Sequence, residues 1–415
     1  MKNILLIGQL TDVSGYGNAV RNYMHNLVSL HRQKKISLSL LNFSFEKHSK
    51  ILPEEKKIIK EFSITNELDV LRGNYNEQDI QKIKDYTKKN YEVVFFLLND
   101  WLAYSTNSDS LKVNSILNNN YICRKSSRVH PCVVWETDSV PDVWAKAYET
   151  VNVGNLICAC EWNRKTFNHF GKTVVIPYSN SFENEYDEVY YDKIKNTVGD
   201  SFVFSSVFQW DKRKGIDKLI TSYYLEFHNN PNVYLVLKTY IGKTMTGANE
   251  TQHIVGKIKE YISNIMHYGK GIEPKCKILV LNDILNKKQI NSIYKASNAY
   301  VTCTRGEGFG LPISEAINFE KPVIVPSIGG HLDFIEENNN FFIDSAMEPV
   351  IGYGNMFWSS IDTNWVEVSI NSTRKKMREC FESKDLIERG VASREFMRSC
   401  LSAEKCIKLF EEVLL

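Results

Sequence analysis

The chain has 415 residues, with 51 Lys and Arg against 49 Asp and Glu, which gives a formal net charge of +2 at pH 7. This length favours two domains over a single hydrophobic core, and the near-balance of charge argues against a dedicated nucleic-acid-binding protein. With 43% hydrophobic residues, the composition is that of a globular protein without long disordered tracts.

The N-terminal stretch predicts a buried strand rather than a targeting segment. The apolar run in "MKNILLIGQLTDVSG" is too short for the hydrophobic part of a signal peptide. The best apolar run, "VVFFLL" at 93–98, is far below the roughly 20 residues of a membrane-spanning helix. Nine cysteines without a CxxC pair indicate reduced thiols and a cytoplasmic protein. A peripheral membrane contact stays open.

Short apolar runs alternate with helical stretches along the chain. The first series predicts strands at 3–8, 36–43, 92–98, 132–136, 155–160 and 173–178. The second series predicts strands at 201–208, 233–240, 277–281, 299–303 and 322–326. This alternation is typical of an α/β fold in which helices cover a parallel sheet.

Between the two series lies a polar stretch, 180–200, without a clear apolar period, and we place the domain boundary there. Open α/β sheets bind ligands outside the carboxyl ends of their strands, so we expect a ligand between the two domains. The C-terminal stretch has apolar residues at helical spacing and predicts a docking helix, with Ile407, Phe410, Val413 and Leu414 on its apolar face. Periodicity leaves open which domain this helix packs on.

A Gly-rich segment after the predicted strand 299–303 carries two carboxylates, Glu307 and Glu315. "TRGEGFG" reads as a loop and "LPISEAINFE" as a helix with Pro312 in its first turn, where the missing N–H costs nothing. The helix N-terminus suits a phosphate, and Gly308 and Gly310 let the backbone approach a ligand. Paired carboxylates suit a polyhydroxylated ligand, one for a sugar and one for a ribose. The alternative is a Glu that complements the helix dipole beside a solvated Glu315.

The segment 204–220, "FSSVFQWDKRKGIDKLI", predicts a strand, a cation-rich turn and a helix that begins near Gly215. Arg213 and Lys214 in this turn suit a diphosphate, since Arg binds phosphate bidentately and Lys supplies a point charge. The alternative is a solvated charged face.

Two stretches of the first series carry weaker signals. In "LTDVSGYGNAVRNYMHNL" (10–27), a strand runs into a Gly-rich turn at Gly15, Tyr16 and Gly17 and then into a helix, a pattern that an ordinary tight turn also produces. In "HPCVVWETDSVPDVW" (130–144), the predicted strand ends at Glu136, at the edge that faces the ligand. A capping or pairing role for Glu136 is the alternative.

The segment "TRGEGFGLPISEAINFEKPVIVPSIGGHLDFI" closely resembles the donor site of the retaining glycosyltransferases of family four. The resemblance covers nearly the full length and is best over 201–345. It implies the GT-B fold, in which two Rossmann-like domains face each other across a cleft. The N-terminal acceptor-binding domain would be 1–185, completed by a C-terminal helix of about 388–415. The donor-binding domain would be 186–387.

The resemblance also implies roles for the site residues. Glu307 would contact hydroxyls of the donor sugar, and Glu315 would hold the ribose of the nucleotide. The backbone of the loop after Glu307 would meet the diphosphate, through Gly308, Phe309, Gly310 and Leu311. The phosphate-binding Lys of the family maps to Lys214.

The sequence departs from the family's pattern at the upstream Arg and at the His of a strand end, and its Gly-rich loop in the first domain corresponds to one in the family. Phe208 or Gln209 stands where relatives have an upstream Arg, so the second cation of the phosphate site is Arg213 or another residue, for which Lys238 is a candidate. Many relatives have a His at the strand end where Trp135 and Glu136 stand, while His130 lies on the wrong side of that strand. The loop with Gly15, Tyr16 and Gly17 would lie over the reaction centre and the acceptor.

The implied reaction moves a hexosyl unit from a GDP- or UDP-sugar to a hydroxyl of a growing glycan, which is lipid-linked, protein-linked or part of a polysaccharide. Retention would proceed through an oxocarbenium-like ion pair, with Glu307, Lys214 and Glu136 as the catalytic residues. The chain has no Asp-x-Asp pair and no HExxH spacing, so we expect neither a metal nor another cofactor. Alternatives are a sugar-nucleotide epimerase of the same fold and a non-catalytic nucleotide-sugar-binding module.

Overall fold

The structure of the chain is a computed structural model, which describes all residues except 13, 43–50, 67–74, 97–118, 141–150, 242–246, 266–273 and 354–361. The chain forms two compact units. The first takes Met1–Ser181 and Leu401–Leu415, and the second takes Phe182–Gly354 and Ile361–Cys400. The sequence predicts a domain boundary at 185/186 and a return of the chain to the first domain at about 388. In the structure the boundary lies slightly earlier, after Ser181, and the chain returns to the first unit later, at Leu401.

The first unit is built on a six-stranded parallel sheet in the order β2-β1-β3-β4-β5-β6. Its strands are β1 (Lys2–Gly8), β2 (Ile36–Asn42), β3 (Glu92–Phe96), β4 (Arg128–Val133), β5 (Leu156–Cys158) and β6 (Thr173–Val175). Its helices are α1 (Gly15–Arg32), α2 (Pro53–Phe62), α3 (Glu77–Tyr86), α5 (Asn119–Lys125), α7 (Glu161–Phe167) and α15 (Ala403–Leu414). The middle of β1 is fully buried, as expected for a strand that is covered on both faces.

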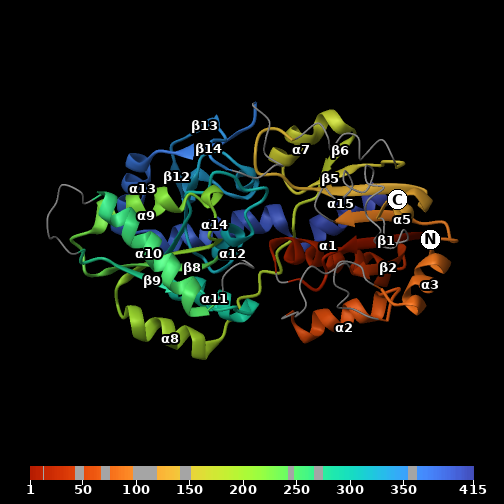
Figure 1. Cartoon of the computed structure of the whole chain (residues 1–415), viewed down its shortest axis with the longest axis horizontal. Helices are drawn as coiled ribbons and strands as arrows, with labels where there is room; N and C mark the ends of the chain where they lie inside the picture. The colour runs from red at the N-terminus through yellow and green to blue at the C-terminus, as the bar shows by residue number, and fades with distance from the viewer. Residues whose placement is uncertain are drawn as a thin grey trace. The chain divides into compact units, whose positions relative to one another are not determined.

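The C-terminal helix α15 lies against α1 at the start of the chain (Figure 1). Its buried residues, Cys406, Phe410 and Leu414, recur every four positions, and the ring of Phe410 packs on Tyr23 with centroids 5.0 Å apart. The predicted docking helix is therefore present, and it completes the first unit.

The second unit has a six-stranded parallel sheet in the order β12-β11-β10-β7-β8-β9 and an antiparallel pair, β13 and β14. Its strands are β7 (Phe202–Gln209), β8 (Val233–Tyr240), β9 (Lys277–Leu281), β10 (Ala299–Val301), β11 (Val323–Pro326), β12 (Phe341–Ile343), β13 (Ser345–Pro349) and β14 (Asn364–Val368). Its helices are α8 (Glu188–Val198), α9 (Ile216–Phe227), α10 (Gly247–Ile265), α11 (Lys287–Ala296), α12 (Leu311–Asn318), α13 (Ile370–Glu382) and α14 (Leu386–Leu401).

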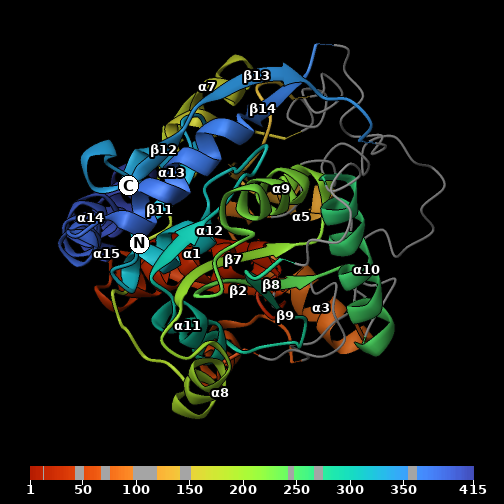
Figure 2. The same cartoon turned by 90° about the vertical axis from the view of Figure 1, so that its left-hand side faces the viewer.

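Helices cover both faces of this sheet, as Figure 2 shows for β7 and β8 with α9 on one side and α11 on the other. One hydrophobic core joins Phe204 and Leu235 to α9, α10 and α13. The other joins Val203 and Val236 to α8 and α11. Successive residues of β7 thus point to opposite faces, which is the pattern of a strand buried on both sides.

All strands of the two predicted series are present, although residues 97 and 98 of the predicted strand 92–98 lie outside the described residues. Two parts of the prediction need correction. Residues 188–198, which the sequence assigns to a linker without an apolar period, form α8 and bury Tyr190, Ile194 and Val198. The strands β12, β13 and β14 are missing from the prediction. Two of them have only weak signals, since β12 is three residues long and β13 is largely exposed.

None of the nine cysteines forms a disulfide, and all but Cys400 are buried, which agrees with the predicted reduced thiols. Within the described residues, no helix combines the length and the hydrophobicity that a bilayer crossing requires.

Candidate functional site

Each six-stranded sheet has a point where the strand order reverses. In the second unit, β8 and β9 follow β7 on one side, while β10, β11 and β12 lie on its other side. The connections after β7 and β10 therefore leave in opposite directions and open a crevice at the carboxyl ends of these two strands. The segments that follow them are the cation-rich turn and the Gly-rich loop, so the fold brings both sequence motifs to one place.

Lys214 and Glu307 meet in this crevice. The ammonium Nζ of Lys214 lies 2.5 Å from Oε1 of Glu307, and both side chains are largely buried, with exposures of 14% and 15%. Arg213 donates from Nη1 to the carbonyl of Gly306 at 2.6 Å, and the N–H of Arg305 donates to the carbonyl of Arg213 at 2.6 Å. The two loops are therefore held together by both side-chain and backbone contacts.

The pKa of Glu307 lies below its ordinary value. Burial alone raises the pKa of this carboxyl, but the charges of Lys214 and Arg213, the hydrogen bond from Lys214 and a smaller effect of His331 lower it further than burial raises it. Glu307 is thus an ionised carboxylate at neutral pH, able to accept hydrogen bonds from hydroxyl groups.

Gly215 makes the close approach of the two loops sterically possible. It ends a 3₁₀ turn, Lys212–Lys214, and precedes α9 with φ at 64°. A Cβ at this position would lie 1.8 Å from the carbonyl oxygen of Cys303. Only glycine fits both this conformation and this contact. The helix start predicted near Gly215 is confirmed.

The Gly-rich loop leads into the N-terminus of α12. Gly310 is the N-cap residue with φ at 94°, and no side chain caps this helix end. Pro312 stands in the first turn, as predicted, and Leu311 is the first helical residue. Phe309 is buried against Phe334, with ring centroids 4.9 Å apart, and so anchors the loop, while Gly308 lies between it and Glu307. An N-terminus of this kind favours an anion at its first N–H groups.

Glu315, one turn into α12, is held by α11. The hydroxyl of Tyr294 donates to Oε2 of Glu315 at 2.9 Å, and the ammonium of Lys287 lies 2.5 Å from Oε1. The side chain keeps 18% exposure. Its carboxylate is thus oriented by two neighbours and still reachable from solvent.

Arg305 is a buried residue of the site that the sequence interpretation missed. Its guanidinium, 4% exposed, donates to both carboxylate oxygens of Asp217 at 2.8 Å and to those of Glu367 at 2.7 and 2.9 Å. It also donates to the carbonyl of Lys212 at 2.7 Å and lies 5.4 Å from the ring centre of Trp365. Arg305 thereby links the Gly-rich loop to the 3₁₀ turn, α9 and β14. Its partner on β14 follows from the fold and not from any spacing in the sequence.

His331 is the second residue that sequence reasoning missed. It is fully buried, and its Nε2 lies 2.8 Å from the carbonyl of Pro326, so Nε2 carries the proton and donates it. Its Nδ1 is buried without a hydrogen-bond partner among the described residues. Burial lowers the pKa of His331, against the opposing effects of the Pro326 carbonyl and Glu307. The ring is neutral at pH 7.

In the first unit, the order reverses between β1 and β3, and the turn with Gly15, Tyr16 and Gly17 follows β1. A Cβ on Gly17 would lie 2.0 Å from the carbonyl oxygen of Asp12, and Ser14 Oγ accepts a hydrogen bond from the N–H of Gly17 at 3.2 Å. Gly17 is therefore needed for the turn itself. A Cβ on Gly15 would meet no atom within 4 Å, so the described chain does not require glycine there. The ring of Tyr16 packs edge-on against Phe96 at 6.4 Å.

The sequence predicts that Glu136 ends a strand, and the structure shows that this prediction is wrong. β4 ends at Val133, and Glu136 lies in the bend beyond it, partly exposed. The chain leaves the sheet because Trp135 donates from Nε1 to the carbonyl of Ser139 at 2.8 Å, while its own carbonyl accepts from Asn163 Nδ2 at 2.8 Å. His130, predicted to lie on the wrong side, is inside β4 and hydrogen-bonded to Glu92 at 3.1 Å.

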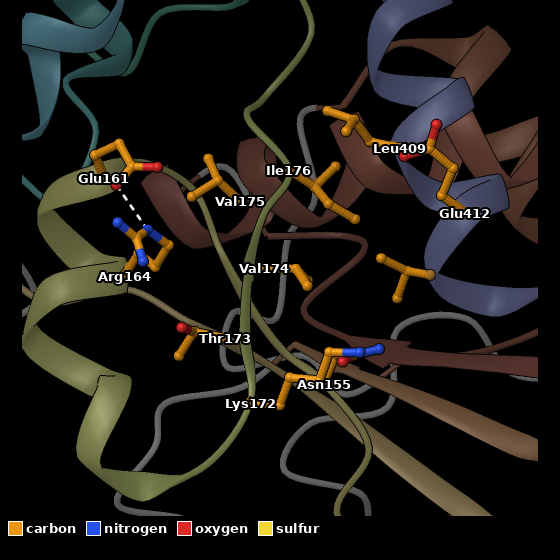
Figure 3. A pocket seen from close by; sticks show the side chains of 11 residues that line it. Asn155, Glu161, Arg164, Lys172, Thr173, Val174, Val175, Ile176, Leu409 and Glu412 are labelled. Carbon is orange, nitrogen blue, oxygen red and sulfur yellow. Dashed lines mark hydrogen bonds and ion pairs between the residues drawn. The ribbon is translucent and has the colours of Figure 1, made fainter.

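A pocket of about 400 Å³ lies elsewhere in the first unit, beside the edge strand β6 (Figure 3). α7 and α15 flank it through Glu161, Arg164, Leu409 and Glu412. Glu161 and Arg164 already pair with each other at 2.6 Å, and none of the predicted site residues lines this pocket. Among the described residues, no three His, Cys, Asp or Glu side chains converge in the way that a metal ion requires.

A family model matches the part of the chain that holds both loops. The family description "Glycosyl transferases group 1" matches residues 191–348, which contain Arg213, Lys214, Glu307 and Glu315. The chain is a glycosyltransferase with a group 1 domain. A search of curated protein sequences finds no match.

Solved structures resemble this glycosyltransferase over its whole length. HepE of Anabaena in complex with UDP and glucose is 13% identical with a TM-score of 0.62, covering 100% of this chain and 99% of HepE. Sucrose-phosphate synthase of Thermosynechococcus elongatus is 15% identical with a TM-score of 0.53, covering 99% and 98%. A UDP-forming α,α-trehalose-phosphate synthase of Burkholderia xenovorans is 11% identical with a TM-score of 0.60, covering 100% and 99%. At these identities the likeness shows the GT-B fold of two Rossmann-like domains.

Proposed function

We propose that the protein is a retaining hexosyltransferase that takes its sugar from a UDP- or GDP-linked donor and gives it to a hydroxyl of a growing glycan. The observation that carries the proposal is the contact of Lys214 with the ionised Glu307. This contact lies at the point where the strand order of the second sheet reverses. A cation for a diphosphate and a carboxylate for sugar hydroxyls then stand side by side. A solved structure of the similar protein HepE contains UDP-glucose, which supports the choice of donor class.

In this proposal the donor binds along the loops of the second unit. Lys214, Arg213 and the N-terminus of α12 bind the diphosphate, because cations and helix N–H groups favour anions. An ammonium has three N–H donors, so Lys214 can hold Glu307 and a phosphate oxygen together. Glu307 accepts hydrogen bonds from the sugar, and Glu315 accepts them from the ribose.

The chemistry is electrostatic. When the glycosidic bond to the diphosphate breaks, negative charge grows on the leaving phosphate, and the preorganised cations stabilise it. The acceptor hydroxyl attacks from the same face and gives its proton to the leaving phosphate oxygen, so the chain supplies no nucleophile. We propose that the reaction needs no metal. The turn at Gly15, Tyr16 and Gly17 and the carboxylate of Glu136 are proposed to contact the acceptor and the sugar, with the protein cytoplasmic or peripheral at a membrane.

A thermal-shift series in EDTA tests donor binding. UDP, GDP, UDP-glucose and GDP-mannose are compared on the wild type, Glu307→Ala, Glu315→Ala and the control Glu161→Ala, an exposed ion-pair residue of the first unit. A ligand at 100 times its Kd stabilises the folded state by about 2.7 kcal/mol. We expect one nucleotide to raise Tm, Glu315→Ala to abolish this rise, and Glu307→Ala to abolish only the increment due to the sugar. No rise with any nucleotide contradicts the proposal, and a rise that returns only with Mg²⁺ contradicts metal independence.

Turnover of the bound donor separates the reaction classes. NMR of the products from donor and a panel of sugar acceptors should show an anomeric configuration equal to that of the donor. A donor that is epimerised without acceptor identifies an epimerase. A donor that binds but is neither hydrolysed nor transferred identifies a binding module.

A further inference from the structure

A second buried cation, Lys238, lies at the carboxyl end of the same sheet. It belongs to β8, where it pairs in register with Val207 of β7 on one side and Leu281 of β9 on the other. Its side chain is only 6% exposed. Lysine is almost never buried to this degree unless it is paired.

Lys238 has no such pair among the described residues. Within that part of the chain, no carboxylate lies within 4 Å of its ammonium and no hydrogen bond from it is found, whereas the buried Arg21 and Arg305 each have a carboxylate partner. The ring centre of Tyr240 lies 5.5 Å from this ammonium. The nearby Glu250 accepts the N–H of Ile241. An unpaired buried charge is costly, so contact with an anion would stabilise this ammonium.

The position of Lys238 relative to the site follows from the register of the strands. Tyr300 of β10 pairs with Ser205 of β7, and Val207 lies two residues further along the same face, next to Lys238. Residues two apart on a strand share a face, so Lys238 and Tyr300 project from the same face of the sheet. Burial raises the pKa of Tyr300, and the charges of Glu307 and Glu315 add smaller increases. Adjacent strands are about 4.8 Å apart, so Lys238 stands one strand beyond β7 on this face.

The last two residues of β7 supply no cation for a phosphate. Phe208 is buried in the hydrophobic core with α9, and the neutral Gln209 is exposed, so neither supplies a cation. Arg213 is oriented by its contact with the carbonyl of Gly306. Burial lowers the pKa of Lys238, although Glu250 and Asp283 oppose this, which is the behaviour of an ammonium that lacks a close anion.

We propose that Lys238 binds a phosphate of the nucleoside diphosphate, as a further cation beside Lys214 and Arg213. The inference rests on the proposed function and assigns a further residue to the same donor site. The diphosphate completes the charge balance of a buried ammonium, and in return Lys238 adds a charge-assisted contact that a nucleoside alone cannot make.

Calorimetric titration of the whole chain with UDP, GDP, uridine and guanosine tests this. The variants are Lys238→Met, which keeps the length of the stem, and Lys238→Arg, which keeps the charge. Lys277→Met is the matched control, because Lys277 stands on the neighbouring strand β9 with its ammonium 5.3 Å from the ring centre of Tyr234 and its side chain exposed. The Tm of each unliganded variant shows that it is folded, and Lys238→Gln replaces Lys238→Met if the latter is not.

We expect Lys238→Met to weaken the diphosphate by about tenfold or more, the scale of one charge-assisted contact, and to leave the nucleoside unchanged. Lys238→Arg should stay close to the wild type, and Lys277→Met should equal it. Equal diphosphate affinity in Lys238→Met overturns the inference while the proposed function stands. Equal losses for diphosphate and nucleoside also overturn it, because Lys238 would then serve the base or the fold. A wild type that binds neither UDP nor GDP removes the proposed function and this inference together.

Discussion

At the scale of single residues, the site depends on a carboxylate that is both buried and ionised. Burial disfavours the charge on Glu307, and the neighbouring cations more than compensate, with Lys214 the largest of them. The same contact thus orders two loops and fixes the protonation state of the group proposed to hold the sugar. It follows that Lys214 controls how the site responds to pH.

Lys214→Met should raise the pKa of Glu307, because burial remains while the main opposing charge is lost. In the wild type the folded-state pKa is depressed below 4.5, so the ionised form persists until the pH falls through this lowered value. In the variant we expect the acid limb of donor binding to move to higher pH. Titration of the donor across pH 4 to 8 measures this, with pH values chosen around the ordinary Glu pKa of about 4.3.

Lys212→Met is the control for this shift. Lys212 belongs to the same 3₁₀ turn, but its ammonium donates to the carbonyl of Ile351 and not to Glu307. Its pH profile should match that of the wild type. An acid limb that does not move in Lys214→Met shows that another group governs the pH response.

Gly215 sets the packing between the loops. Its backbone is left-handed, with φ at 64° and ψ at 32°, and this conformation costs a residue with a Cβ about 1–2 kcal/mol. Gly215→Ala adds the clash with Cys303, for a further cost of about 1–3 kcal/mol from overpacking. The control is Gly256→Ala on α10 of the same unit, where a Cβ meets no atom within 4 Å and the helix should gain about 0.5–1 kcal/mol. Urea unfolding of both variants measures the two changes, and an unchanged stability in Gly215→Ala would mean that the loops relax apart.

At the scale of elements, the sequence predicts the parts of the site that local chemistry determines. The strand, the Gly-rich loop and the helix with Pro312 are all present, because positive φ angles and a helix first turn select residue types locally. Glu136 failed as a strand end, because a side-chain hydrogen bond from Asn163, distant in the chain, takes the backbone out of the sheet. The partners of Arg305 were equally out of reach, because Glu367 comes from β14, which the sequence did not reveal.

Arg305→Met should destabilise the second unit by about 2–3 kcal/mol, because it removes a guanidinium that is 4% exposed and binds two carboxylates. The carboxylates left behind are 37% and 24% exposed, so water screens part of the loss. The matched control is Arg164→Met. Arg164 also contacts a carboxylate at 2.6 Å, but both partners are about half exposed, at 44% and 48%, and such pairs contribute about 0–1 kcal/mol. Urea unfolding measures both, and a small loss in Arg305→Met would show that Lys218, which lies 3.0 Å from Glu367, takes over.

At the scale of the whole molecule, alternation of strands and helices predicts two α/β units. The order of the elements along the chain and the short connections between them determine this fold class. The limits of the units follow from packing instead. α8 joins the second unit through three apolar residues spaced four apart, a signal that the surrounding charges obscured. α14 begins before the predicted return at residue 388, yet Arg394 on this helix binds Glu320 and the carbonyl of Phe182 in the second unit.

This division predicts how fragments of the chain behave. Residues 182–400 contain both cores around the sheet of the second unit, so this fragment should fold alone with a cooperative unfolding transition. Residues 1–181 lack α15, and without it Tyr23 loses the ring of Phe410 and Lys35 loses Glu411 at 2.5 Å. We expect this fragment to be unstable alone and to regain a cooperative transition when a peptide of residues 401–415 is added.

The same peptide with Phe410→Ala provides the control, since loss of a buried Phe costs about 3–5 kcal/mol. It should restore the fragment 1–181 only at much higher concentration, by a factor of about 100 or more. Circular dichroism during peptide titration measures both affinities. If residues 1–181 unfold cooperatively without the peptide, and with unchanged stability, α15 covers a unit that is already complete. If the fragment 182–400 fails to fold, its cores depend on the first unit, and the donor site cannot be studied apart from the whole chain.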